Sequence, residues 1–250
     1  MLAIDRWAWT NRWHGFHPAE KGVLAGGMLL QAVTLPAPTT GPLIIIVMGL
    51  ITVVGAGIPA VTWLRVMALP GAFLITSIPL LILSLDFSSG LNIELSPRGG
   101  EIALNVVLRS LAAVSCLTFL TLTTPTVDLV PLLRRLGIPQ PVVDIMLLIY
   151  RLVFVFLERA DNTRRAQLAR QGYRDFRHSL RSLGLLVSNL FQRSLERAQR
   201  MEIGLAARGF EGELRVLTPG RVLSLSRLVI IINLLLGVAV SGLLLDMIVQ

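Results

Sequence analysis

The chain has 250 residues, of which 54% are apolar and 15% are charged, and its mean hydropathy is +0.71. A soluble domain usually has about 25% charged residues, so this composition excludes an ordinary water-soluble protein and indicates an integral membrane protein. The 23 basic residues outnumber the 15 acidic ones, which gives a net charge of +8. A nucleic-acid-binding protein needs a soluble fold with a basic groove, so we expect no nucleic acid among the partners.

The scarcity of lysine, cysteine and histidine excludes several kinds of site. Lys21 is the only lysine and lies in Ala19-Glu20-Lys21-Gly22, whereas a Walker nucleotide site needs Gly-Lys followed by Ser or Thr. Cys116 is the only cysteine, which excludes an internal disulfide and a thiolate metal cluster. His14 and His17 have no third ligand nearby in the sequence, and zinc sites need three or four. We therefore predict a non-catalytic chain without a metal site.

Hydrophobic segments follow one another from the N-terminus. The first 21 residues contain charged residues and three tryptophans (Trp7, Trp9 and Trp13) in place of the apolar centre of a signal peptide. These tryptophans suit the membrane interface. Spanning the hydrocarbon takes about 20 apolar residues. We predict five spans, at residues 18–35, 42–58, 66–85, 102–122 and 222–249, the first two forming a tight hairpin at Pro36-Ala37-Pro38.

Residues 142–157 form a sixth apolar segment, which we predict to be the interfacial, partly buried half of a longer helix. Asp144 and Arg151 each cost about 2.5–3.5 kcal/mol at the centre of a span. Residues 134–227 contain 17 arginines and 8 acidic residues, a net charge of +9, whereas the rest of the chain has 6 basic and 7 acidic residues. If 142–157 crossed the bilayer, most of this basic block would lie opposite Arg134 and Arg135, against the positive-inside bias.

Five spans predict an all-α integral membrane protein with a cytoplasmic domain. The N-terminus is then cytoplasmic, the loop 86–100 is external, and the chain re-enters the cytoplasm near Thr124. Residues 1–124 form an N-terminal interfacial segment with four spans, and residues 125–220 form the cytoplasmic domain. Residues 221–250 form the last span, which leaves the C-terminus external.

The cytoplasmic domain is predicted to contain one short and two long helices. Start and stop signals place the short helix at 126–136 and the long ones at about 141–171 and 179–208. The last helix carries an apolar stripe spaced by three and four residues, made of Leu180, Leu183, Val187, Leu190, Phe191, Leu195, Ala198, Met201 and Leu205. Because its arginines lie off the stripe, this helix combines an apolar face with a basic one.

An internal repeat with a spacing of 38 residues links the two long helices. Leu157-Glu158-Arg159-Ala160 recurs as Leu195-Glu196-Arg197-Ala198, and Ala169-Arg170 recurs as Ala207-Arg208. The repeat brings an Ala-Arg pair to the end of each helix.

A glycine follows each of these arginines, Gly209 at once and Gly172 after one residue. Glycine ends helices, so Arg170 and Arg208 are predicted to project from helix ends. The planar fork of an arginine can bind a carboxylate or cap the exposed carbonyls of a partner. Two equal helix ends imply two equal partners.

The chain resembles the transmembrane T component of energy-coupling factor (ECF) transporters, in particular the cobalt-transport permease of the CbiQ type. The resemblance spans nearly the whole chain. It rests on Ile4-Asp5-Arg6-Trp7-Ala8, Thr10-Asn11-Arg12, His17-Pro18-Ala19-Glu20-Lys21, Leu129-Val130-Pro131-Leu132-Leu133-Arg134-Arg135-Leu136-Gly137 and the two Ala-Arg signatures.

The resemblance implies a multi-pass protein of the bacterial inner membrane whose cytoplasmic coupling domain docks two ATPase subunits. Those subunits bind ATP and Mg²⁺, and a separate substrate-binding membrane subunit carries the metal site, so no cofactor, metal or catalytic residue is expected in this chain. By resemblance the ATPase-coupling roles fall on Ala169, Arg170, Gln171, Ala207, Arg208 and Gly209. The first signature departs from the family pattern, because Gln171 stands where a small residue commonly follows the arginine.

Three alternatives stay open at this stage. The same coupling role could serve nickel or a vitamin in place of cobalt. A membrane-embedded enzyme would use His14 and His17 with Asp5 and Glu20. A lipid- or RNA-binding basic block would give association that weakens steeply as the salt concentration rises.

Overall fold

The computed structural model describes residues 3–86, 92–95, 99–135, 137–210 and 223–249. These residues divide into two compact units, each described by itself below. Unit 1 comprises Met1–Leu129 and Gly220–Gln250, and unit 2 comprises Val130–Pro219. The second unit is thus an insertion between two parts of the first.

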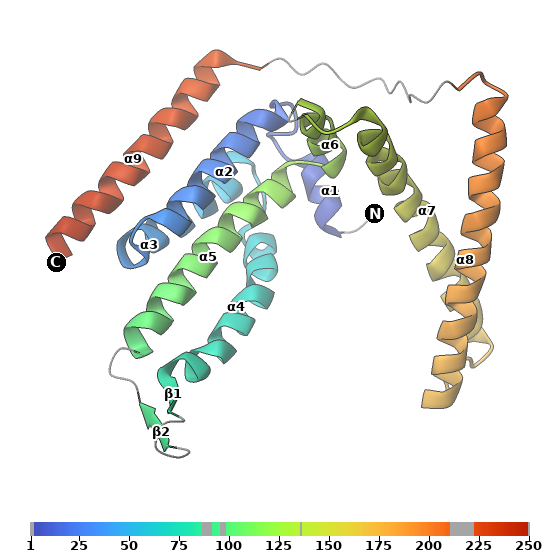
Figure 1. The fold of residues 1–250 in the computed structure, drawn as a ribbon, viewed down its shortest axis with the longest axis horizontal. Helices are drawn as coiled ribbons and strands as arrows, with labels where there is room; N and C mark the ends of the chain where they lie inside the picture. The colour runs from blue at the N-terminus through green and yellow to red at the C-terminus, as the bar shows by residue number, and fades with distance from the viewer. Residues whose placement is uncertain (1–2, 87–91, 96–98, 136, 211–222, 250) are drawn as a thin grey trace. The chain divides into compact units, whose positions relative to one another are not determined.

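Unit 1 is a bundle of helices with one short hairpin (Figure 1). Its elements in chain order are α1 (Ala3–Thr10), α2 (Pro18–Thr34), α3 (Ala37–Leu50), the π-helical turn η1 (Ile51–Gly55), α4 (Ala60–Ile82), β1 (Leu83–Asp86), β2 (Asn92–Leu95), α5 (Gly99–Thr123) and α9 (Leu225–Val249). The antiparallel pair β1–β2 was not predicted. It adds a small sheet to a chain that is otherwise helical among its described elements.

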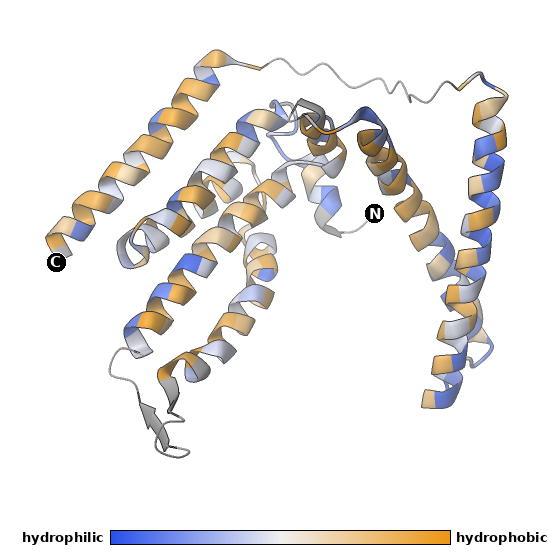
Figure 2. Ribbon diagram, viewed as in Figure 1, coloured by the Kyte–Doolittle hydropathy of each residue, from blue (hydrophilic) through white to orange (hydrophobic). Residues whose placement is uncertain are grey.

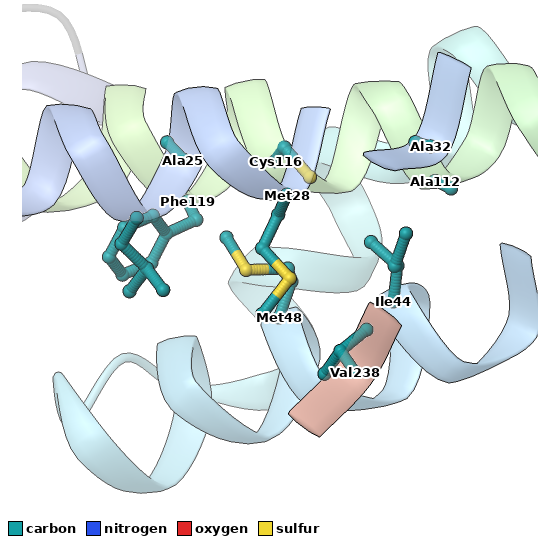
Figure 3. Packing of buried hydrophobic residues seen from close by; sticks show 10 residues of the cluster. Ala25, Met28, Ala32, Ile44, Met48, Ala112, Cys116, Phe119 and Val238 are labelled. Atoms are coloured by element: carbon teal, nitrogen blue, oxygen red, sulfur yellow. The ribbon is translucent and has the colours of Figure 1, made fainter. Parts of the chain in front are cut away.

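Helix α5 is the centre of unit 1, since it contacts α1, α2, α3 and α4. Its buried face (Ala112, Cys116 and Phe119) meets residues from three other helices, as Figure 3 shows: Ala25, Met28 and Ala32 of α2, Ile44 and Met48 of α3, and Val238 of α9. Small residues alternate with large ones across this core, which lets the helices approach closely.

The start of the chain packs onto this bundle. The Trp13 ring meets Phe119 edge-on at 5.7 Å between ring centroids, and Trp7 packs against a second cluster of Ala56, Ile58 and Leu122. Trp9 is 39% exposed. Two of the three tryptophans therefore have structural contacts in the bundle, and their predicted place at the membrane interface stays a prediction.

The predicted hairpin of the first two apolar segments is present. Pro18 begins α2 in the position where its missing N–H costs nothing, and the side chain of His17 caps the helix by accepting from Ala19 N. The helix ends at Thr34, and α3 begins at Ala37 after Pro36. The two helices contact each other, so the turn is as short as the prolines predicted.

Five described helices are long and apolar enough to cross a membrane: Ala37–Gly55, Ala60–Pro79, Gly99–Thr123, Gln140–Ala169 and Leu225–Ile248. The predicted all-α membrane fold is confirmed, but the set of spans differs from the prediction at two places. Helix α2 has 17 residues, about 25 Å at 1.5 Å per residue, which falls short of a 30 Å hydrocarbon core.

Helix α7 (Gln140–Ala169) is among the five helices that could span, and α2 is not. The apolar half of α7 was predicted to be interfacial. The one continuous helix of 30 residues contains an apolar stretch long enough to span, and length and composition are what this criterion measures. The charge argument that excluded 142–157 concerns orientation, which helix length does not address.

The described part of unit 2 contains two long helices, α7 and α8 (Phe176–Ala206), preceded by the short α6 (Thr126–Arg135), which begins in unit 1. All three lie within three residues of the predicted bounds. Figure 2 shows that α7 is hydrophobic in its first half and more hydrophilic in its second, whereas both kinds of residue alternate along α8. The six residues between α7 and α8 make them an antiparallel pair that contact each other.

Candidate functional site

The end of α7 is a Schellman motif, in which two backbone hydrogen bonds close the last turn. Gly172 N donates to Gln167 O at 2.8 Å, and Gln171 N donates to Leu168 O at 3.0 Å. Gln171 adopts the left-handed conformation that this motif requires, with φ of 58°. Arg170 is then the last half-helical residue, directly before the reversal of the chain.

The end of α8 has the same construction. Phe210 N donates to Leu205 O at 3.1 Å, and Gly209 N donates to Ala206 O at 3.0 Å. Gly209 takes the left-handed position, with φ of 71°. Arg208 therefore occupies in α8 the position that Arg170 occupies in α7.

The two helix ends correspond residue by residue at the 38-residue spacing of the repeat. Both hydrogen bonds, the left-handed residue and the arginine each recur at that spacing. One expectation needs correction: Gln171, and not Gly172, is the left-handed residue that ends α7. A left-handed glutamine carries a steric cost that glycine avoids. The first signature, with Gln171 after the arginine, therefore ends its helix at a higher backbone cost than the second, with Gly209.

Gly172 is needed for a different reason, namely the close approach of α8. A Cβ at this position would lie 2.7 Å from Ser182 Oγ and 3.0 Å from Gln167 O. The Ser182 hydroxyl donates to Gly172 O at 2.7 Å, and the backbone carbonyl of Ser182 accepts from Gln167 Nε2 at 2.9 Å. Tyr173 Oη in turn donates to Gln167 Oε1 at 2.9 Å.

These hydrogen bonds fix the first arginine end against α8. Gln167, Ser182 and Tyr173 were not among the predicted site residues. Ser182 is buried in a helix whose other described residues are half-buried or exposed. Its only sequence signal is that it is a polar residue in the first turns of α8. This elbow, formed by Gln167, Gly172, Tyr173 and Ser182, holds the turn after Arg170 against the start of α8.

Both arginines, Arg170 and Arg208, are exposed at their helix ends. Neither guanidinium makes a hydrogen bond or ion pair with any residue that the structure describes. By contrast, Arg165 pairs with Asp161 at 2.6 Å and Arg200 with Glu196 at 3.6 Å. A cation at a helix C-terminus is stabilised by the helix dipole, so the local fold favours a positive charge at both positions.

The two arginine ends lie at opposite ends of α8. Arg170 lies beside the start of α8, since Gln167 and Gly172 contact Ser182, and Arg208 follows the last turn of this 31-residue helix. At 1.5 Å per residue the helix is about 46 Å long. The two arginine ends therefore lie about one helix length apart.

The apolar stripe of α8 is largely uncovered within unit 2. Leu180 is 62% exposed, Val187 63% and Phe191 65%. A contiguous exposed apolar face of this kind marks an interaction surface with protein or membrane. The periodicity predicted the stripe, and the structure adds that the adjacent α7 does not cover it.

The residues of the enzyme alternative have structural contacts. The His17 imidazole caps α2, and the His14 ring lies 5.4 Å from the Trp9 ring. The carboxylate of Glu20 lies at the start of α9, where it accepts from Ser224 N. Among the described residues, no group of three or more His, Cys, Asp or Glu side chains could hold a metal ion.

Comparison with known proteins identifies the family. The sequence pattern of the CbiQ family, described as cobalt transport protein, matches residues 10–219 of this chain. The chain belongs to the CbiQ family. A cobalt transport protein CbiQ from Rhodobacter capsulatus is 38% identical over 245 residues, which cover 98% of this chain and 99% of the relative. A cobalt transport protein CbiQ from Salmonella typhimurium is 31% identical over 223 residues, 85% of this chain and 99% of the relative.

The match to the CbiQ family includes both arginine ends and all of α6, α7 and α8. The predicted resemblance is thereby confirmed. CbiQ membership and the five apolar helices together make the chain a multi-pass membrane protein of a transport family.

Proposed function

We propose that this chain is the transmembrane coupling subunit of an ECF-type ABC transporter that takes up cobalt. The chain itself is a non-catalytic permease subunit. Two cytoplasmic ATPase subunits bind ATP and Mg²⁺, and a separate membrane subunit binds the metal ion. Cobalt is proposed because the relatives bear the name of cobalt transport proteins; nickel or a vitamin is the alternative cargo.

The observation that carries this proposal is the pair of matching helix ends. Two equal groups at opposite ends of an antiparallel helix pair are related by an approximate two-fold rotation. Two copies of one ATPase are most commonly related by a two-fold axis as well. Arg170 and Arg208 therefore present the same group to each copy of a symmetric pair, which is what docking of two identical ATPases requires.

The chemistry of the two arginine ends fits a protein partner with exposed carbonyl or carboxylate oxygens. A guanidinium has five N–H donors and no acceptor, and a hydrogen bond to a charged group contributes about 1.5–3 kcal/mol. Ala169 and Ala207 precede the arginines, and their small side chains leave room for a groove to close around each helix end. Gln171 and Gly209 complete the two contacts.

Transmission of motion in this proposal depends on the contact between α7 and α8, which connects the two arginine ends. The elbow hydrogen bonds of Ser182 hold the end of α7 against α8, so displacement of one ATPase moves both helices. The motion reaches the substrate subunit only if the two states of the ATPase pair differ in their contacts with the arginine ends. The N-terminus and coupling domain are cytoplasmic in this arrangement, and the C-terminus is external.

The test is a double charge reversal, Arg170→Glu with Arg208→Glu. The matched control is Arg159→Glu with Arg197→Glu, because these arginines are also exposed, also repeat at 38 residues and change the net charge equally. Interface contacts of central importance contribute at least about 2 kcal/mol each, so loss of two should weaken ATPase binding by roughly a thousand-fold. ATPase binding is measured by co-purification of the ATPases in detergent. Transport is measured by radiolabelled Co²⁺ uptake.

The expected result is loss of ATPase binding and uptake in the arginine-end variant, with membrane insertion unchanged, and retention of both in the control. Equal ATPase binding by the two variants contradicts the proposal. Competition of Co²⁺ uptake by Ni²⁺ separates the alternative metals. Unchanged uptake in a His14→Ala variant would argue against the membrane-enzyme alternative.

A further inference from the structure

Glu20 and Lys21 are adjacent, oppositely charged and buried in the first turn of α2. Each is 1% exposed. Burial of a charge is costly unless the charge is paired or hydrogen-bonded, so each side chain must have a partner that justifies its position. The partners lie at the ends of two different helices of unit 1.

Lys21 meets the C-terminal end of α5. Its ammonium donates to Thr123 O at 2.8 Å, and Thr123 is the last residue of that helix. Asn11 Nδ2 donates to the same carbonyl at 3.2 Å. The last carbonyls of a helix lack intrahelical partners, and a cation there is favoured by the helix dipole. Lys21 is thus a cap for α5 supplied by another helix.

Glu20 meets the N-terminal end of α9. Its Oε1 accepts from Ser224 N at 2.9 Å, and its Oε2 lies 3.2 Å from Arg227 Nε. Ser224 directly precedes α9 and accepts from Leu228 N, so Glu20 binds the same backbone N–H that a capping-box glutamate would bind within its own helix. The guanidinium of Arg227 also lies 4.5 Å from the centre of the Phe16 ring.

The two helix ends have one property in common: one ends the last complete helix of unit 1 before the inserted unit 2, and the other begins the first helix of unit 1 after it. We call these two helix ends the junctions of unit 2. Helix α5 ends at Thr123, before the inserted unit 2, and α9 begins at Leu225, after it. Both junctions are therefore bound to adjacent residues at the start of one helix. Each sign of charge matches the helix end that it meets.

We propose that Glu20 and Lys21 form a charge clamp that holds both junctions of unit 2 together on α2. The two residues are positioning residues: they fix the ends of the chain segment that carries Arg170 and Arg208. If the proposed coupling function holds, on which this second part rests, the clamp converts motion of unit 2 into motion of the bundle and prevents the two junctions from separating.

The first experiment measures the junctions directly and does not depend on the coupling function. Spin labels are placed on the exposed residues Thr121 of α5 and Ser226 of α9, in the full chain with Cys116→Ala. Electron–electron resonance gives the distribution of distances between them. Lys21→Met and Glu20→Gln are each expected to broaden this distribution. An unchanged distribution in both variants overturns the clamp.

The second experiment uses the complex with its ATPases in proteoliposomes and measures ATP hydrolysed per Co²⁺ transported. A hydrogen bond to a charged group contributes enough to change an equilibrium by about ten-fold or more, so Lys21→Met should raise this ratio by about that factor while ATPase binding persists. The matched control is Gln31→Leu, which removes another hydrogen bond from α2, to Leu235 O in the middle of α9 at 2.9 Å.

The outcomes separate the two proposals. A raised ratio in Lys21→Met and Glu20→Gln, but not in Gln31→Leu, supports the clamp. An equal rise in Gln31→Leu shows general loss of stability and overturns it. Failure of the unmodified chain to bind ATPases contradicts the coupling function, and in that case the spin-label distances still decide whether the junctions are clamped.

Discussion

Replacing Gly209 with alanine is expected to open the second arginine end while leaving the rest of α8 intact. Gly209 has φ of 71°, and a residue with a Cβ pays about 1–2 kcal/mol for the left-handed conformation. Alanine also restricts the unfolded chain, which offsets roughly 0.4–1 kcal/mol. No described atom lies within 4 Å of a Cβ at this position, so the remaining cost of about 1 kcal/mol is backbone strain.

The control is Gly204→Ala in the same helix. A Cβ at Gly204 also meets nothing within 4 Å of the described structure, but Gly204 has a helical backbone. Alanine in a helix interior is more stable than glycine by roughly 0.5–1 kcal/mol. The two substitutions add the same methyl group and are expected to change stability in opposite directions.

The assay is amide hydrogen exchange, which reports the free energy of local opening. The Phe210 amide, which donates to Leu205 O, should exchange about five-fold faster in Gly209→Ala, since 1 kcal/mol corresponds to that factor. In Gln171→Gly the converse is expected, because glycine removes the strain at φ of 58°. Equal exchange in Gly209→Ala and Gly204→Ala would refute the assignment of both helix ends as Schellman motifs.

Two further predictions concern close contacts of glycine. A Cβ at Gly242 of α9 would overlap Thr40 of α3, whereas a Cβ at Gly237 of the same helix meets nothing within 4 Å among the described residues. Gly242→Ala should therefore lower the free energy of unfolding of the bundle in detergent by about 1–3 kcal/mol. A comparable loss in Gly237→Ala would contradict this packing. Gly172→Ala should loosen the elbow because its Cβ would lie 2.7 Å from Ser182 Oγ. Proteolysis of the six-residue connection between α7 and α8 should then be faster than in the unmodified chain. An equal rate of proteolysis would show that the elbow has room for a side chain.

Local sequence signals were sufficient for the positions of the helices in unit 2. The predicted bounds 126–136, 141–171 and 179–208 compare with Thr126–Arg135, Gln140–Ala169 and Phe176–Ala206. Prolines, glycines and caps act on the backbone within a few residues, so the sequence alone predicts where these helices begin and end. The same holds for the apolar stripe, which is a property of one helix.

Signals of the same kind were insufficient where two conformations compete at neighbouring residues. Gly172 was expected to end α7, yet Gln171 takes the left-handed position that ends it. Glycine is required at position 172 for a tertiary reason, since a Cβ there would lie 2.7 Å from Ser182 Oγ of α8. This contact joins two helices, so the residues next to Arg170 in the sequence do not reveal it. The short hairpin of β1 and β2 was likewise outside the helical pattern that the hydropathy predicted.

The sequence by itself determined that this is an α-helical membrane protein, where most helices begin and end, and that two arginines recur 38 residues apart at equivalent positions. Composition, periodicity and repeats are properties of neighbouring residues or of sums over the chain. Only the tertiary structure decided which helix ends Glu20 and Lys21 meet, because Lys21 and Thr123 are 102 residues apart and Glu20 and Ser224 are 204 apart. Contacts over such separations depend on how helices pack, which no local pattern encodes.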